Sequence, residues 1–74
     1  MGDRCEVYVA LLDEGVAVWR PVVAERVGPA LYRLAGPVPE GESWQFQPSE
    51  IVRCEQRDFA DGERGLTAVE RARA

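Results

Sequence analysis

Glycine and proline interrupt this sequence at short intervals, and that punctuation restricts its fold more than any other feature. Turn-forming residues occur at 13–15, 28–29, 36–37, 48–50 and 61–62, and no segment between them has the pattern of a long helix. These segments are short and rich in valine, leucine and aromatic residues, as strands are. The sequence therefore predicts an all-β domain.

The first half of the chain predicts three strands. In residues 5–11 the odd positions are apolar, which is the period of a half-buried strand and puts Tyr8 on the opposite face. Residues 16–27 are predicted to form one long strand, bent or at an edge at Pro21, because proline has no N–H for a central ladder. Residues 31–34 form a short third strand.

Alternation in the second half predicts a fourth strand over residues 43–47. Trp44 and Phe46 would face the core, and Gln45 and Gln47 would face the other way. A short 3₁₀ step at 48–50 then leads into a fifth strand over residues 51–55, with Val52 and Cys54 facing inward.

The 74 residues allow one domain, with a core predicted over residues 5–57 and a tail over 58–74. Within the tail, residues 66–71 read as a sixth strand or as a helix capped by Thr67 with Glu70, and the strand is favoured.

This order of elements over residues 5–55 resembles an SH3-like barrel, and residues 44–52 carry the most specific part of the likeness. The resemblance implies a small, closed barrel of five to six strands with the 3₁₀ step before the fifth. Residues 11–22 and 44–48 are also similar to small uncharacterised bacterial proteins, and that likeness implies no activity.

Charge and hydropathy exclude several classes of partner. The formal charge is −4 and the nine basic residues are all arginine, so a phosphate backbone is repelled and nucleic acid is not expected as a partner. The longest apolar run, residues 7–12, is far shorter than the roughly 20 residues that span a bilayer, so we expect no membrane association and a cytoplasmic location.

The residue types also restrict chemistry. The chain has no histidine, which excludes serine–histidine and cysteine–histidine catalysis, and no phosphate-binding glycine pattern. Cys5 and Cys54 are predicted on neighbouring antiparallel strands, either as buried free thiols or as a disulfide or redox switch. Two cysteines cannot complete a zinc site, so no metal and no cofactor are expected.

The remaining candidates are binding residues. They are the outward glutamines, two aromatic residues outside the core pattern, and the acids of the loop after residue 36: Gln45, Gln47, Tyr8, Trp19, Glu40 and Glu42. They favour a non-catalytic protein-interaction module that binds an unknown protein or forms a homo-oligomer. Acidic turns such as this one usually serve solubility alone. The alternative is an acidic immunity or antidote protein that inhibits a basic toxin.

One enzymatic alternative comes from a resemblance alone. Residues 43–48 resemble a strand of the plasmid-encoded type II dihydrofolate reductases, SH3-like barrels that form a tetramer around a pore. The resemblance implies that Gln45, Phe46 and Gln47 line such a pore. Gln47 stands where that family has tyrosine, and the chain has no lysine to hold the cofactor phosphates.

Overall fold

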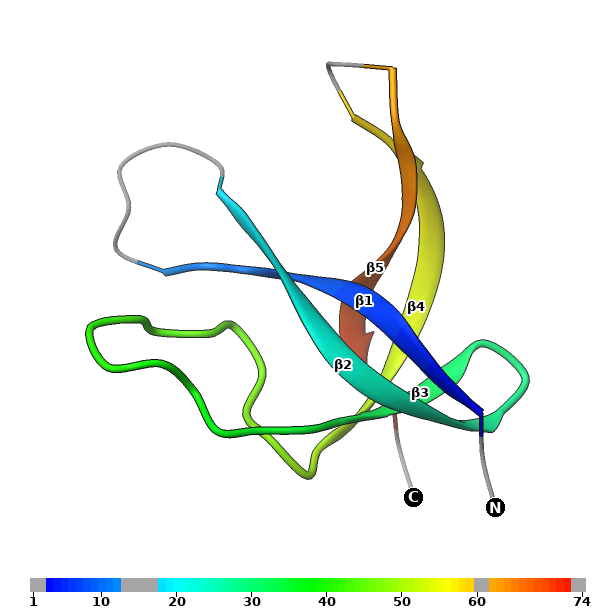
Figure 1. Cartoon of the computed structure of the whole chain (residues 1–74). Helices are drawn as coiled ribbons and strands as arrows, with labels where there is room; N and C mark the ends of the chain where they lie inside the picture. Colours follow the sequence, from blue (N-terminus) through cyan, green and yellow to red (C-terminus); the bar gives the residue numbers. More distant parts are fainter. Residues whose placement is uncertain (1–2, 13–17, 60–61, 73–74) are drawn as a thin grey trace.

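The computed structural model describes residues 3–12, 18–59 and 62–72. Five strands form a closed barrel in sequence order (Figure 1): β1 (Arg4–Ala10), β2 (Trp19–Gly28), β3 (Leu31–Leu34), β4 (Ile51–Asp58) and β5 (Arg64–Arg71). Successive strands pair antiparallel, and a parallel contact between β1 and β5 closes the ring. The all-β prediction is confirmed, and the architecture fits a small SH3-like barrel.

The β1 strand follows the predicted alternation. Val7 and Val9 are fully buried, while Tyr8 between them is half-buried and lies on the outer face. Val7 stands opposite the buried Val22 of β2, so the two strands contribute the same face to the core.

The β2 strand pairs with β1 along residues 19–25 and with β3 only from Ala24 onward. Pro21 therefore lies where β2 has one strand neighbour, which is the edge environment expected from its missing N–H. The predicted turn at 13–15 and the strand start at Val16 lie outside the described residues.

The tail is a strand. β5 pairs antiparallel with β4 and begins at Arg64, two residues before the predicted position, and the helical alternative is wrong. Ala68 and Thr67 of β5 are buried, so the tail completes the core.

The predicted fourth strand over residues 43–47 is wrong. Trp44 makes a single bridge to Leu11, and the chain then bends and turns, which leaves the barrel with five strands. The predicted orientations are nevertheless correct, because Trp44 and Phe46 are buried while Gln45 and Gln47 are exposed. Alternation here comes from a segment that closes the end of the core.

The step before β4 is a β-turn and not a 3₁₀ helix. The Glu50 amide donates to the Gln47 carbonyl at 3.2 Å across the central residues Pro48 and Ser49. Ser49 has φ of +76°, a left-handed conformation that ends any helical winding.

The core draws on all five strands and on the loop between β3 and β4, residues 35–50, called the β3–β4 loop below. Its buried apolar members are Val7, Val9, Val22, Ala24, Tyr32, Leu34, Trp44, Phe46, Val52, Cys54 and Ala68. The loop therefore supplies two of the three aromatic residues of the core, Trp44 and Phe46, and it is part of the folded unit.

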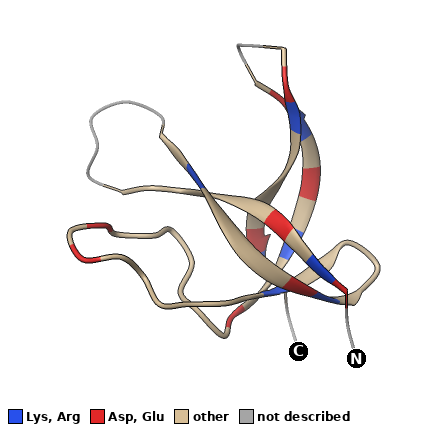
Figure 2. Cartoon of the chain, viewed as in Figure 1, with Lys and Arg blue, Asp and Glu red and all other residues tan. Residues whose placement is uncertain are grey.

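Charged residues occur along the strands and at the outer end of the β3–β4 loop (Figure 2). Most of the arginines pair with a carboxylate, as Arg33 does with Glu25 at 3.0 Å and Arg64 with Asp58 at 2.8 Å. Within the part of the chain that the structure describes, no helix has the length and apolar character needed to cross a membrane.

Candidate functional site

Three aromatic rings meet on the outside of the barrel. Tyr8 comes from β1, Trp19 from the start of β2, and Phe59 from the residue that follows β4. The Phe59 ring lies edge to face against both others, at centroid distances of 4.9 Å to Tyr8 and 6.1 Å to Trp19. All three are half-buried and none belongs to the core, so they form an aromatic patch on the surface.

Gly65 makes this arrangement possible. A Cβ atom placed on Gly65 would lie 2.5 Å from Cε2 of Tyr8 and 3.2 Å from Cε2 of Phe59. Both rings therefore lie directly against the backbone of β5, which no other residue allows without moving them. Gly65 lies inside strand β5.

An arginine completes the patch. The guanidinium of Arg57 lies 5.1 Å from the centroid of the Trp19 ring, a cation–π contact. Arg57 is exposed, and among the described residues it makes no ion pair with a carboxylate. We call Tyr8, Trp19, Phe59 and Arg57 together the aromatic face.

The predicted glutamines separate into two environments. Gln45 is exposed, and its backbone amide donates to the carbonyl of Ala10, the β1 residue that stands opposite Trp19, at 2.9 Å. The side chain of Gln47 instead donates to the Trp44 carbonyl at 3.3 Å, within the turn. The structure therefore brings Gln45, Tyr8 and Trp19 onto one surface and leaves Gln47 apart.

The two acids of the β3–β4 loop, Glu42 and Glu40, also lie in different environments. Glu42 accepts from Arg20 Nε at 3.1 Å and from the Trp44 indole at 3.0 Å, and these bonds, Arg20 first, hold the pKa of its carboxyl below the usual range. Glu40 is exposed. Glu42 therefore anchors the β3–β4 loop, while Glu40 is available to an outside group.

The cysteines are both free thiols. Cys5 stands opposite Ala24 of β2 and Cys54 opposite Ala68 of β5, so the prediction that their strands pair with each other is wrong. Burial raises the pKa of Cys54 to about 11, with the negative charge of a Cys5 thiolate as a second cause, and burial also raises the pKa of Cys5. Neither is an activated nucleophile at neutral pH.

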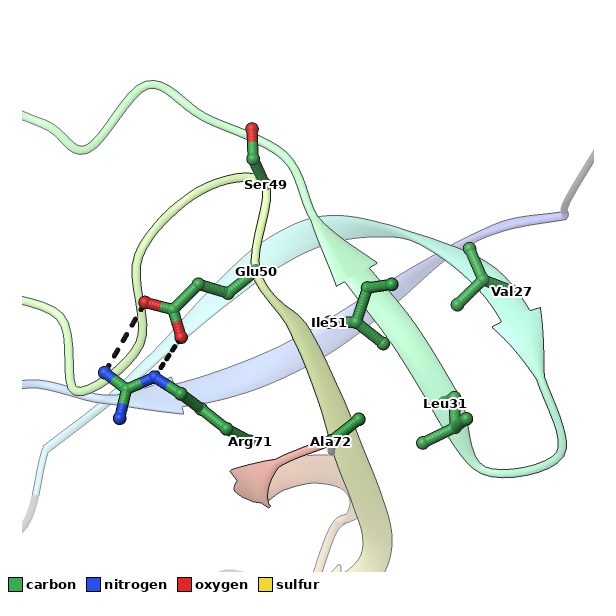
Figure 3. Close-up of a pocket in the computed structure, with 7 residues that line it drawn as sticks. All are labelled: Val27, Leu31, Ser49, Glu50, Ile51, Arg71 and Ala72. Carbon is green, nitrogen blue, oxygen red and sulfur yellow. Dashed lines mark hydrogen bonds and ion pairs between the residues drawn. The ribbon is translucent and has the colours of Figure 1, made fainter. Parts of the chain in front are cut away.

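A depression of about 540 Å³ lies at the other end of the barrel (Figure 3). Its walls are the apolar side chains of Val27, Leu31, Ile51 and Ala72, and an ion pair between Glu50 and Arg71 closes one side. Arg71 also contacts the Phe46 ring, 5.6 Å from its centroid. The charged groups of this depression are paired with each other, in contrast to Arg57.

Sequence reasoning missed Phe59, Arg57 and Gly65 as parts of the site. Phe59 carried a usable signal, since it is a single aromatic residue in a polar segment of charged residues and turn signals. The role of Gly65 becomes visible only when β1 and β5 lie side by side, because the ring that it admits is 57 residues earlier in the chain.

No protein-family model, curated protein or solved structure matches this chain. Its function is therefore inferred from the chemistry of its own residues.

Proposed function

We propose that this chain is a non-catalytic protein-interaction module that binds through the aromatic face. The observation that carries the proposal is the meeting of Tyr8, Trp19 and Phe59 on the outer surface, against a glycine that admits them. Aromatic residues and arginine are enriched in protein interfaces, and tryptophan, tyrosine and arginine are enriched among the few residues that supply most of the binding energy there. The core is filled by other residues and does not use these rings.

A non-catalytic role agrees with the residues that would have to perform chemistry. The sequence has no histidine, and burial raises the pKa of both thiols, so neither an imidazole base nor a thiolate is available at neutral pH. Free thiols also agree with a reducing compartment, and we place the protein in the cytoplasm.

The two alternatives have less support. An acidic inhibitor of a basic toxin needs unpaired carboxylates, but Glu25, Glu42, Glu50 and Asp58 each pair with an arginine of this chain. A pore lined by a strand containing Gln45 and Gln47 has no such strand to use. The aromatic face favours the module over both.

Affinity capture from a cell lysate tests the proposal. Trp19→Ser removes the ring that stacks on Arg57, and Val23→Ser removes an apolar group that is 53% exposed, elsewhere on β2. We expect a partner retained by the wild type and by Val23→Ser to be lost with Trp19→Ser. Quantitative mass spectrometry of the captured proteins gives the readout.

A second pair of variants tests the position of the face. Gln45→Arg adds a bulky charge beside Ala10, while Gln47→Arg places the same charge in the turn. We expect only Gln45→Arg to weaken capture. Capture that is equal for Trp19→Ser and the wild type would contradict the proposed binding surface.

A further inference from the structure

Arg57 has an environment that sets it apart from its neighbours on the same hairpin. Arg53 pairs with Glu55 and Glu70, and Arg64 pairs with Asp58. The carboxylates nearest to Arg57 along β4 are thus engaged by other arginines, while Arg57 rests on Trp19 with its N–H donors directed at no described carboxylate. A guanidinium in this position is prepared to bind a carboxylate from outside.

The β3–β4 loop presents the complementary group. The Glu42 amide donates to the Pro39 carbonyl at 3.1 Å, which closes a tight turn with Glu40 and Gly41 at its centre. Gly41 has φ of +87°, and no atom lies within 4 Å of where its Cβ would stand, so the turn projects into solvent. Glu40 is at its tip, and no ion pair to it is found among the described residues.

The loop is also held in place, which lowers the entropic cost of docking it. Glu42, directly after the turn, receives bonds from Arg20 and from the buried Trp44. Exposed Pro37 and Pro39 precede Glu40 and give the segment flat apolar surfaces. Proline rings of this kind pack well against aromatic side chains.

The loop and the aromatic face do not contact each other through these two charged groups within one molecule. Neither Glu40 nor Arg57 has an ion pair among the described residues, and in Figure 1 the β3–β4 loop and the paired strands β4 and β5 extend from the barrel in different directions. The unpaired glutamate of one copy and the unpaired arginine of a second copy are therefore available to each other.

We propose that the aromatic face of one copy receives the β3–β4 loop of a second copy, with Glu40 paired to Arg57 and Pro37 and Pro39 against the rings. This inference rests on the proposed function and names the partner as the chain itself. The contact joins two different surfaces, so it is head to tail and each copy keeps one free loop and one free face. Because a loop of this length buries less than a stable interface, the contact is weak and is expected only at high protein concentration.

Charge reversal with mixing tests this contact. Glu40→Arg disables the loop and keeps the face, whereas Arg57→Glu disables the face and keeps the loop. We expect each variant alone to be monomeric at a millimolar concentration at which the wild type associates, because its loop and face then carry the same charge. We expect an equimolar mixture to associate again, because each loop then meets a face of opposite charge. Sedimentation velocity measures the size, and the wild type at the same concentration forms larger species.

Two further measurements sharpen the test. The double variant Glu40→Arg with Arg57→Glu restores opposite charges and should again associate with itself. In ¹⁵N spectra of the mixture, the indole signal of Trp19 should move with concentration, while that of Trp44, buried and bonded to Glu42, should stay fixed. Asp3→Arg and Arg4→Glu make the same charge changes at the start of β1, on exposed residues, and should associate as the wild type does.

A wild type that remains monomeric at millimolar concentration overturns the inference, and so do single variants that associate as well as the wild type. Either result leaves the proposed function to be judged by lysate capture. A partner lost with Trp19→Ser from a strictly monomeric protein would mean that the module holds and that its partner is another protein.

Discussion

At the scale of single residues, the absence of a side chain at Gly65 allows the aromatic rings to pack on the outer surface. Gly65 lies in β5, and the rings of Tyr8 and Phe59 occupy the space where its Cβ would stand. Tyr8 is brought there because β1 and β5 are neighbours in the closed barrel. The aromatic face thus depends on a residue with no side chain of its own.

Gly65→Ala should therefore destabilise the protein even though alanine is ordinarily tolerated in strands. The new Cβ would overlap Tyr8, and overpacking of this kind costs about 1–3 kcal/mol. Urea denaturation measures the loss. In a Tyr8→Ala background the same change should cost much less, whereas equal costs in both backgrounds would show that the ring is not the obstacle.

Because the thiol of Cys54 is buried, we expect the folded protein to lose stability at alkaline pH. Its pKa is raised to about 11 by burial, above that of the unfolded thiol, so between those values the folded state binds more protons than the unfolded state. The stabilisation is complete below the unfolded pKa and disappears as the pH rises through about 11.

Thermal denaturation of the wild type and of Cys54→Ala from pH 8 to pH 11 checks this. The melting temperature of the wild type should fall more steeply than that of the variant, because the variant has no thiol to ionise at that position. Parallel curves would mean that Cys54 has an ordinary pKa in the folded state.

At the scale of elements, the β3–β4 loop behaves as part of the core. Trp44 and Phe46 are 3% and 4% exposed, and Glu42 fastens the loop to β2 through Arg20. Backbone bonds join it to the end of β1, from Leu12 to the Ser43 carbonyl at 2.7 Å and from Gln45 to the Ala10 carbonyl at 2.9 Å. The loop therefore folds with the barrel.

Glu42→Gln tests that attachment through its pH dependence. The bonds from Arg20 and Trp44 lower the pKa of Glu42, so its contribution is present above the unfolded pKa and is lost as the pH falls through the lower, folded value. The Trp44 indole resonance should titrate in this acidic range in the wild type and stay constant in Glu42→Gln. Titration that persists in the variant would assign the effect to another carboxyl, with Glu50 the next to examine.

These elements also explain what the sequence could predict. Val7, Val9 and Val52 alternate with outward residues because one face of each strand is buried, and that pattern is local and readable. Residues 43–47 show the same alternation for a different reason, since a loop segment that packs two side chains into the core also has an inner and an outer side. Periodicity indicates which side chains are buried, but it does not identify the strand with which a segment pairs.

The aromatic face was predictable only in part. Tyr8 departs from the apolar phase of its own strand, so its outward position could be read from the sequence. The contact of Arg57 with Trp19, and of Gly65 with Tyr8, joins residues far apart in the chain and depends on how the strands curve around the barrel. No local pattern encodes that relation.

At the scale of the whole molecule, all five strands contribute buried side chains to the core, so no strand is dispensable. β5 contributes the buried Ala68 and Thr67, and the Thr67 hydroxyl donates to the Glu55 carbonyl at 3.1 Å. A domain of this size has little stability in reserve.

A chain that ends at Asp58 should consequently be unfolded, because it lacks β5 and leaves the inner faces of β1 and β4 uncovered. A chain that ends at Ala72 keeps every strand and should fold as the full sequence does. Dispersion of amide resonances in proton NMR spectra distinguishes the two, and a dispersed spectrum for the shorter chain would show that residues up to Asp58 fold alone.

The parallel contact between Tyr8 and Thr67 has a consequence for kinetics. It joins the first strand to the last across 59 residues. During synthesis β1 can therefore pair with β5 only after β5 has left the ribosome. Closing so distant a pair is entropically demanding, and folding of such a barrel takes roughly milliseconds to seconds. The nascent chain therefore exposes an apolar strand during translation, when a chaperone has its best opportunity to bind.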